Sequence, residues 1–205
     1  MLSFNGRGLM KPQRSNMDYK ELLANIYTNG SKTSPRGMET KEIINPKLVV
    51  DGWNFYASPH QRPYEMVEKY LIGELAWYMS GSIKAEDIVK YSKFWDKLKD
   101  QDGEVNSNYG YLTLYKPNNV GYTGYVWALK SLTDDKHSRQ AIILYNDRDY
   151  YYDGNKDYIC TQLQHFMIRD NELISIVYLR SSDAILGLTY DIPWWSILQQ
   201  LPYGS

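Results

Sequence analysis

The chain has 205 residues, with 23 basic and 24 acidic side chains and a net charge of −1. This balance argues against a field that attracts nucleic acid or a charged membrane, and the length predicts one domain. The single cysteine excludes an intramolecular disulfide and fits a reducing compartment such as the cytoplasm. No apolar run reaches the roughly 20 residues that a membrane helix requires.

Residues 1–17 are basic and lack the apolar core of a signal peptide, so we expect a flexible N-terminal arm before a domain at 18–205. Asp18 is a candidate cap for the first helix, and Gly30 is expected to end it. Apolar spacing predicts helices at 19–27, 63–80, 87–99, 122–132 and 192–201.

Short apolar runs predict strands within 43–56 and at 141–145. Residues 163–169 and 172–179 alternate apolar and polar side chains on either side of Asp170-Asn171, which predicts a β-hairpin. Helices and strands interleave, which indicates an α/β or α+β fold.

Glu74 falls on the apolar stripe of the helix predicted at 63–80. A carboxylate is costly to bury without a partner. One interpretation places Glu74 at the edge of the stripe or against a backbone donor. The other makes it a catalytic acid or base with a raised pKa.

Two arginines stand where a loop meets a structured element. Arg36 lies in the turn-rich segment S-K-T-S-P-R-G, and Arg139 precedes the strand predicted at 141–145. Each is either an ordinary surface charge or a guanidinium fork for phosphate. The polar segment 106–110 is either a loop or the wall of a pocket.

Cys160 opens a segment that also holds Arg180, Ser181, Asp183 and Asp191. A cysteine beside a cation is a candidate nucleophile, whereas the plainer interpretation is an inert buried thiol. His165 is the nearest histidine in the sequence, which supports a cysteine–histidine hydrolase poorly. No zinc-ligand spacing, P-loop or G-x-G-x-x-G sequence is present.

Seven pieces of sequence follow one another in an order that is typical of one family. They are Arg36, G-E-L-A-W-Y around Glu74, F-W-D-K-L with Trp95, G-E-V-N-S-N-Y-G with Tyr109, S-R-Q with Arg139, C-T at Cys160, and R-S-S-D-A-I-L-G-L-T-Y-D from Arg180 to Asp191. In these pieces the chain resembles the thymidylate synthase and deoxycytidylate hydroxymethylase family, and most closely its phage hydroxymethylase branch. The resemblance implies a mixed β-sheet with flanking helices, a homodimer, and location in the host cytoplasm if a phage encodes the chain.

The resemblance also implies a reaction. Cys160 attacks carbon 6 of a pyrimidine nucleotide, and carbon 5 then accepts a one-carbon unit from methylenetetrahydrofolate. Water completes the reaction in hydroxymethylases, and hydride completes it in synthases. The implied roles are adduct formation and proton transfer (Cys160, Glu74, Tyr109), phosphate binding (Arg36, Arg180, Ser181, and Arg139 from the partner subunit) and folate binding (Trp95, Asp183, Gly187). No metal is implied.

Asp191 is implied to select the base, because synthases carry asparagine at this position and cytosine-specific hydroxymethylases carry aspartate. Thr161 replaces the histidine of synthases, which fits the same branch. Departures from the family pattern are Gln140 in place of a second arginine, and His165 in place of a glutamine.

The chain stops at Ser205, before the H-x-Y motif and the C-terminal tail of the family, so we expect a C-terminally shortened member. The expected function is folate-dependent hydroxymethylation of dCMP. The alternatives are methylation or hydroxymethylation of dUMP, and a shortened relative that binds nucleotide without full activity.

Overall fold

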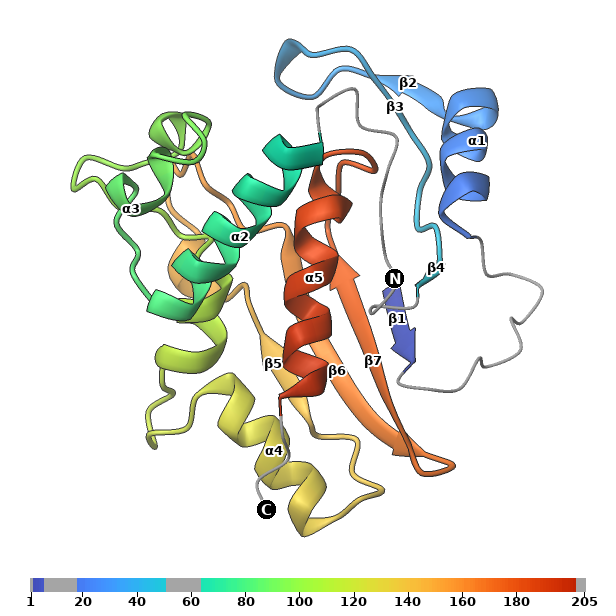
Figure 1. Ribbon diagram of the computed structural model, residues 1–205, viewed down its shortest axis with the longest axis vertical. Helices are drawn as coiled ribbons and strands as arrows, with labels where there is room; N and C mark the ends of the chain where they lie inside the picture. Colours follow the sequence, from blue (N-terminus) through green and yellow to red (C-terminus); the bar gives the residue numbers. More distant parts are fainter. Residues whose placement is uncertain (1, 6–17, 51–63, 202–205) are drawn as a thin grey trace.

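A five-stranded sheet, in the order β4-β1-β7-β6-β5, forms the centre of the molecule (Figure 1). The computed structural model describes residues 2–5, 18–50 and 64–201. The strands of the sheet are β1 (Leu2–Asn5), β4 (Leu48–Val50), β5 (Ile142–Leu144), β6 (Thr161–Arg169) and β7 (Glu172–Leu179). Neighbouring strands are antiparallel except β1 and β4, which are parallel. The sheet is therefore mixed, and with its helices it confirms the expected fold class.

The hairpin β6-β7 forms where the sequence predicts it. Asp170 and Asn171 have φ values of 52° and 60°. A two-residue type I′ turn requires positive φ at both positions, and aspartate and asparagine tolerate that conformation well. A bulge interrupts the pairing between Thr161 and Leu163, directly after Cys160. Bulges redirect side chains and are common beside active sites.

The helices are α1 (Tyr19–Asn29), α2 (Tyr64–Ser80), α3 (Glu86–Val89), α4 (Gly124–Asp134) and α5 (Gly187–Gln200). Asp18 caps α1 as predicted: its carboxylate accepts a hydrogen bond from the Glu21 amide at 2.8 Å, and Glu21 accepts one from the Asp18 amide at 3.0 Å. This reciprocal pair satisfies two amide groups that the helix leaves open. The short strands β2 (Ser31–Thr33) and β3 (Thr40–Glu42) form a second hairpin after α1.

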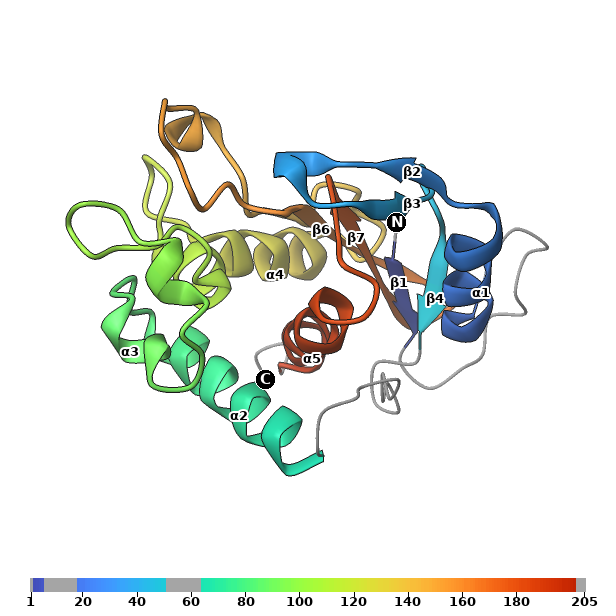
Figure 2. The same ribbon diagram turned by 90° about the horizontal axis from the view of Figure 1, so that it is seen from above.

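The two faces of the large sheet differ in exposure. Paired residues on one face are buried, including Ile143, Gln164 and Val177. Helix α5 lies against this face, with α2 outside it (Figure 2), and the Gln164 amide donates to the Trp195 carbonyl at 3.1 Å. On the opposite face Leu144 is 60% exposed and Tyr178 is 40% exposed. The core therefore lies between the sheet and the helices, on one side only.

Three expectations for local structure were wrong. Residues 2–5 form an interior strand of the sheet, where we expected part of a flexible arm; residues 6–17 lie outside the described part. The helix expected at 87–99 is a single turn, α3, followed by the 3-10 turn Trp95–Lys97. Helix α5 begins at Gly187, ahead of the expected start at Ile192. Strand β4 lies within 43–56, and residues 51–56 are outside the described part.

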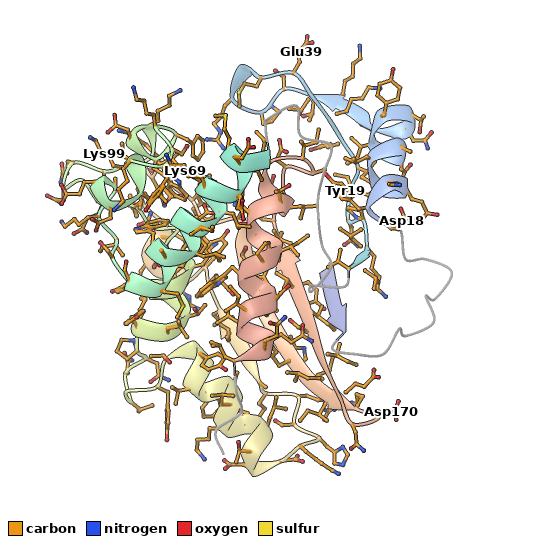
Figure 3. All side chains as sticks on the ribbon, in the orientation of Figure 1. Asp18, Tyr19, Glu39, Lys69, Lys99 and Asp170 are labelled. Carbon is orange, nitrogen blue, oxygen red and sulfur yellow. The ribbon has the colours of Figure 1, made fainter. Side chains whose placement is uncertain are left out.

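Side chains at the ends of the molecule identify its two hairpin tips. Glu39 lies in the loop of the β2-β3 hairpin, just before β3, and Asp170 marks the tip of the β6-β7 hairpin (Figure 3). Tyr19 faces inward from α1, and its hydroxyl donates to the Ala184 carbonyl at 2.8 Å. This contact ties α1 to the loop that leads into α5. None of the helices described is long and apolar enough to cross a membrane.

Candidate functional site

Glu74 is buried on α2, with 4% of its surface exposed. The Tyr70 hydroxyl, one helical turn earlier, donates to Glu74 Oε1 at 2.6 Å. The indole N–H of Trp95 donates to that same hydroxyl at 2.9 Å. Burial raises the pKa of Glu74 to about 7, although the hydrogen bond from Tyr70 and the neighbouring Tyr78 hydroxyl act to lower it. A carboxyl with this pKa exchanges its proton readily near neutral pH, as a general acid or base must.

Asp191 lies on α5 and faces Glu74. Desolvation raises the pKa of the Asp191 carboxyl well above its usual range, and the negative charge of Glu74 raises it further. The side chain is half-buried and so keeps some access to a ligand. Two carboxyl groups that share one desolvated site resist double ionisation. Asp191 therefore keeps its proton to a higher pH than an exposed aspartate does, and in the protonated form it has one O–H donor and one carbonyl acceptor.

Cys160 is half-buried at the end of the loop that precedes β6. Burial raises the pKa of the thiol, and the charges of Asp191 and Asp157 raise it further. Arg180 and, more weakly, Arg36 act in the opposite direction. Burial outweighs both guanidinium groups, so the resting side chain is the neutral thiol. Its proton must leave before the sulfur can act as a nucleophile.

Arg180 holds the backbone that carries Cys160. Its Nε donates to the Ile159 carbonyl at 3.1 Å, and its Nη2 donates to the Tyr158 carbonyl at 2.5 Å. Its guanidinium carbon lies 5.0 Å from the centroid of the Tyr158 ring. The Arg180 amide also donates to the Cys160 carbonyl at 3.0 Å. These contacts fix the guanidinium beside the thiol, while the exposed side chain retains N–H groups for an anion.

Arg36 lies on the β2-β3 hairpin. It lies in the exposed 3-10 turn Pro35–Gly37, with φ of 54° in the left-handed region. Such a conformation is uncommon in a residue that has a Cβ. Its effect on the pKa of Cys160 places its charge on the same side of the molecule as the thiol.

Tyr109 forms a buried wall behind the thiol. Its ring stacks on Tyr78, with centroids 5.4 Å apart, and the Thr161 hydroxyl donates to its oxygen at 3.0 Å. Burial raises the pKa of Tyr109, and the charges of Asp191 and Cys160 raise it further. The next residue, Gly110, must lack a side chain, because a Cβ there would lie 1.7 Å from the Tyr78 carbonyl oxygen. The polar segment at 106–110 is thus packed against the core, with Asn108 and Tyr109 buried, and forms a wall beside the thiol loop.

Asp157 anchors the thiol loop to this wall. Its two carboxylate oxygens accept hydrogen bonds from the Ser107 amide at 2.7 Å and the Ser107 hydroxyl at 2.6 Å. The Asn106 side chain donates to the Asp157 carbonyl at 3.1 Å. The sequence analysis assigned no role to Asp157 or Ser107. The run of polar residues at 106–108 is the sequence signal for this contact.

Asp183 and Gly187 lie at the start of α5. One Asp183 oxygen accepts from the amides of Ile185 at 2.8 Å and Leu186 at 2.6 Å, which caps the turn before the helix. A Cβ on Gly187 would lie 3.3 Å from the Ser182 hydroxyl and 3.8 Å from an Asp191 oxygen. Ser181 is exposed directly after Arg180. These residues line the same end of the molecule as Cys160.

Arg139 stands apart from this group, whereas Trp95 joins it from inside the protein through Tyr70. Arg139 lies beyond Ile142, which pairs with His165, whereas Cys160 lies at the opposite end of β6. Within one chain Arg139 therefore does not join Arg36 and Arg180. Trp95 is only 6% exposed, with its indole N–H directed at Tyr70. Tyr70 itself was missed, although its spacing of four residues from Glu74 on one helical face is a readable signal.

Known proteins resemble this chain in sequence. A family model described as Thymidylate synthase matches residues 17–202. Deoxycytidylate 5-hydroxymethyltransferase of Enterobacteria phage T4 is 31% identical over 163 residues, which are 77% of this chain and 62% of that protein. The chain thus spans less than two thirds of the phage relative. Thymidylate synthase of Pseudomonas fluorescens (strain SBW25) is 25% identical over 202 residues, covering 89% of this chain and 71% of that protein.

A solved structure resembles it in fold. Thermostable thymidylate synthase A from Bacillus subtilis matches with a TM-score of 0.58 at 18% sequence identity. The match covers 90% of this chain and 72% of that chain. At this identity the likeness concerns the fold alone.

Proposed function

The chain belongs to the thymidylate synthase family, and from this premise we propose that it hydroxymethylates carbon 5 of a cytosine nucleotide, with dCMP as the favoured substrate. Methylenetetrahydrofolate is the proposed co-substrate and one-carbon donor. The observation that carries the proposal is the grouping of Asp191 with both Glu74 and Cys160, in which burial raises the pKa of each carboxyl group and of the thiol.

In the proposed reaction the Cys160 thiol loses its proton and its sulfur bonds to carbon 6 of the base. The electron pair of the 5,6 double bond moves to carbon 5, which bonds to the one-carbon unit of the folate. The carbon 5 proton is then removed and tetrahydrofolate departs, leaving an exocyclic methylene. Water adds to that methylene, and the sulfur leaves carbon 6. Glu74 carries the protons and orders the water, for which its pKa of about 7 is suited.

Asp191 is proposed to recognise the base. As a neutral acid it donates its O–H to ring nitrogen 3 of cytosine and accepts from the exocyclic amino group. The name of the phage relative, deoxycytidylate 5-hydroxymethyltransferase, supports cytosine. The raised pKa of Asp191 is also compatible with uracil as the base, because a protonated carboxyl group can donate to oxygen 4 of uracil and accept from its N3–H. A uridylate-directed methylase or hydroxymethylase is therefore the second candidate.

The arginines are proposed to bind the nucleotide phosphate. Arg36, Arg180 and Ser181 lie at the thiol end of the sheet and offer exposed donors for a dianion. Arg139 lies at the other end of β6, and we propose that it serves the site of a partner subunit in a homodimer. The exposed sheet face with Leu144 and Tyr178 is the surface proposed to pair.

Folate is proposed to bind at the mouth of the site. Asp183 and Gly187 lie beside Asp191 at the start of α5, where a flat ligand can approach the base. Trp95 is proposed to border the folate by the edge of its ring, since little of its surface is open. If a phage encodes the chain, the reaction takes place in the host cytoplasm.

One incubation tests the proposal. Purified protein is mixed with methylenetetrahydrofolate and equal amounts of dCMP, CMP and dUMP, and products are identified by mass spectrometry. The expected product is 5-hydroxymethyl-dCMP, and Cys160→Ala is expected to abolish it while leaving thermal unfolding unchanged. A methyl group on uracil would overturn the proposal in favour of the rival. Nucleotide binding without any product would point to a binding protein.

A further inference from the structure

A chain of hydrogen bonds joins Trp95 to two side chains that lie one turn apart on α2. Trp95 Nε1 donates to Tyr70 Oη at 2.9 Å, across 25 residues, and Tyr70 Oη donates to Glu74 Oε1 at 2.6 Å. The hydroxyl of Tyr70 therefore accepts one hydrogen bond and donates another. A hydroxyl that accepts a hydrogen bond is a stronger donor, because the two bonds polarise each other.

The chain occupies only one of the two oxygens of Glu74. The other oxygen, Oε2, is buried and has no hydrogen-bonding partner within residues 2–5, 18–50 and 64–201. An unpartnered buried carboxylate oxygen is costly, so a ligand group or a water is expected to bind there. The hydroxyl on Oε1 thus sets the orientation of the carboxyl group and leaves Oε2 for the reacting partner.

The position of Tyr70 suits a role in orientation. Its ring lies edge-on against Tyr190, with centroids 4.6 Å apart and an interplanar angle of 76°. Tyr190 precedes Asp191, the acid proposed to bind the base. Tyr70 is thus packed between the proton-carrying acid on α2 and the base-recognising acid on α5.

From this geometry we propose that Tyr70 is a positioning residue, which holds Glu74 Oε1 so that Oε2 exchanges protons with the bound nucleotide, and that Trp95 supports Tyr70 through its indole N–H. The proposal rests on the proposed function only for the identity of the nucleotide. It gives Trp95 a structural role, as the hydrogen-bond donor to Tyr70, in addition to the proposed contact with folate.

The titratable groups that face Glu74 define what must be controlled. They are Tyr70 and Tyr78 on the same helix and Asp191 on α5. Both tyrosines remain neutral, because burial raises each pKa well above 10. The hydrogen bond from Tyr70 favours the carboxylate and acts to lower the pKa of Glu74. Removal of that hydroxyl therefore raises the pKa of Glu74.

The test follows the carboxyl group directly and needs no turnover. Infrared spectra are recorded against pH for protein labelled at the glutamate carboxyl carbon, and the spectrum of Glu74→Gln is subtracted to isolate Glu74. We expect a midpoint of about 7 in the wild type. Tyr70→Phe is expected to move it upward by about one pH unit, and Trp95→Phe by about a third of that or less.

Two matched controls separate positioning from packing. Trp77→Phe trims a buried tryptophan that packs against Trp95, at 4.9 Å between centroids, but lies outside the hydrogen-bonded chain. Tyr125 lies on α4, on a different helix from Glu74, and its hydroxyl donates to the Leu201 carbonyl at 3.2 Å. Tyr125→Phe removes that hydroxyl. Both controls are expected to leave the Glu74 midpoint unchanged.

A double variant decides whether Trp95 acts through Tyr70. In the Tyr70→Phe background, Trp95→Phe is expected to add no further shift, because its acceptor is gone. An unchanged or lowered midpoint in Tyr70→Phe overturns the proposal, as does a Trp77→Phe shift equal to that of Trp95→Phe. If Tyr70→Phe does not fold, the contrast of Trp95→Phe with Trp77→Phe decides the matter alone.

Activity provides the separate readout. If the proposed function holds, the pH profile of kcat/KM for dCMP moves upward in Tyr70→Phe together with the infrared midpoint. If the wild type makes no product from any nucleotide while the infrared shifts appear, the proposed function fails and the role of Tyr70 stands.

Discussion

The two sides of the site are built in opposite ways. The acidic side consists of Glu74, Asp191 and Tyr109, which lie on helices or the buried wall and have strongly raised pKa values. The arginine side consists of Arg36 and Arg180, which are exposed on loops at the end of the sheet. Cys160 lies between them, and both sides shift its pKa, in opposite directions.

This difference assigns a separate task to each side. A buried group that lacks its hydrogen-bonding partner costs about 1–3 kcal/mol, so buried acids discriminate strongly between similar bases. Exposed cations bind the hydrated phosphate dianion and therefore discriminate little between nucleotides that differ only in the base. Salt screens this attraction. We therefore expect substitutions on the acidic side to change selectivity and pH dependence, and substitutions on the arginine side to change affinity.

The largest effect is expected from Asp191→Asn on the acidic side. Asparagine always carries a donor for oxygen 4 of uracil, whereas aspartate has no such donor once it ionises. An ionised aspartate still accepts from the exocyclic amino group of cytosine, so it penalises uracil more than cytosine. The ratio of kcat/KM for dCMP to that for dUMP is expected to fall by at least about a hundredfold. Competition assays with both nucleotides measure this ratio. An unchanged ratio would mean that base choice is made elsewhere.

The next effect tests the arginine side. Arg180→Ala removes a cation that lowers the pKa of Cys160 and two hydrogen bonds to its loop. We expect roughly tenfold to hundredfold weaker nucleotide binding, with no change in preference between dCMP and dUMP. The pKa of the thiol, followed by the pH dependence of alkylation, is expected to rise, and Arg36→Ala is expected to raise it less. Arg169→Ala, at the far end of β6, is the control and should change neither quantity.

A third prediction concerns stability and pH on the acidic side. Burial raises the pKa of Glu74 from 4.5 to about 7. The folded state therefore holds a proton that the unfolded state releases, and stability falls as pH rises through this window. The free energy of unfolding of the wild type is expected to fall relative to Glu74→Gln by roughly 2–3 kcal/mol between pH 4.5 and 7. Urea titrations at several pH values measure the free energy of unfolding of both proteins. A wild type that lost stability relative to Glu74→Gln as the pH was lowered would contradict the prediction.

The smallest effect is expected from Thr161→Val, which tests the wall between the two sides. The substitution keeps the shape of the side chain and removes the donor to the Tyr109 hydroxyl. A loss of about 1 kcal/mol in stability is expected, with a few-fold loss in kcat and little change in nucleotide affinity. A large change in affinity would place Thr161 on the phosphate-binding side instead. Thr113→Val, which loses a bond to a backbone carbonyl on the same wall, is the matched control.

Sequence patterns predicted the parts of the fold that local rules control. The capping residue Asp18, the turn at Asp170-Asn171 and the stripe that carries Glu74 were all readable. The break after α3 was not, because no glycine or proline marks it and tertiary packing decides it. The start of α5 was also missed, since Pro193 suggested a first-turn position and instead lies inside the helix.

The site followed the same division. Spacing within one segment drew attention to Cys160 and Asp191, and family resemblance connected them to Arg36. The hydrogen bond between Trp95 and Tyr70 joins residues whose separation has no periodic signal, so only the folded chain reveals it. Likewise Asp157 and Ser107 meet only because the thiol loop crosses the wall at 106–110.

Strand β1 has a consequence for how the protein is made. It is an interior strand of the sheet, between β4 and β7, where Leu2 pairs with both Leu48 and Val177. At ribosomal speeds of roughly 5–20 residues per second, β7 emerges on the order of ten seconds or more after β1. Until then β1 can pair only with β4, because β7, its other neighbour in the sheet, has not yet been made. Closing so long a loop is slow. Nascent chains are therefore expected to depend on chaperones late in synthesis, and folding to follow the release of β7.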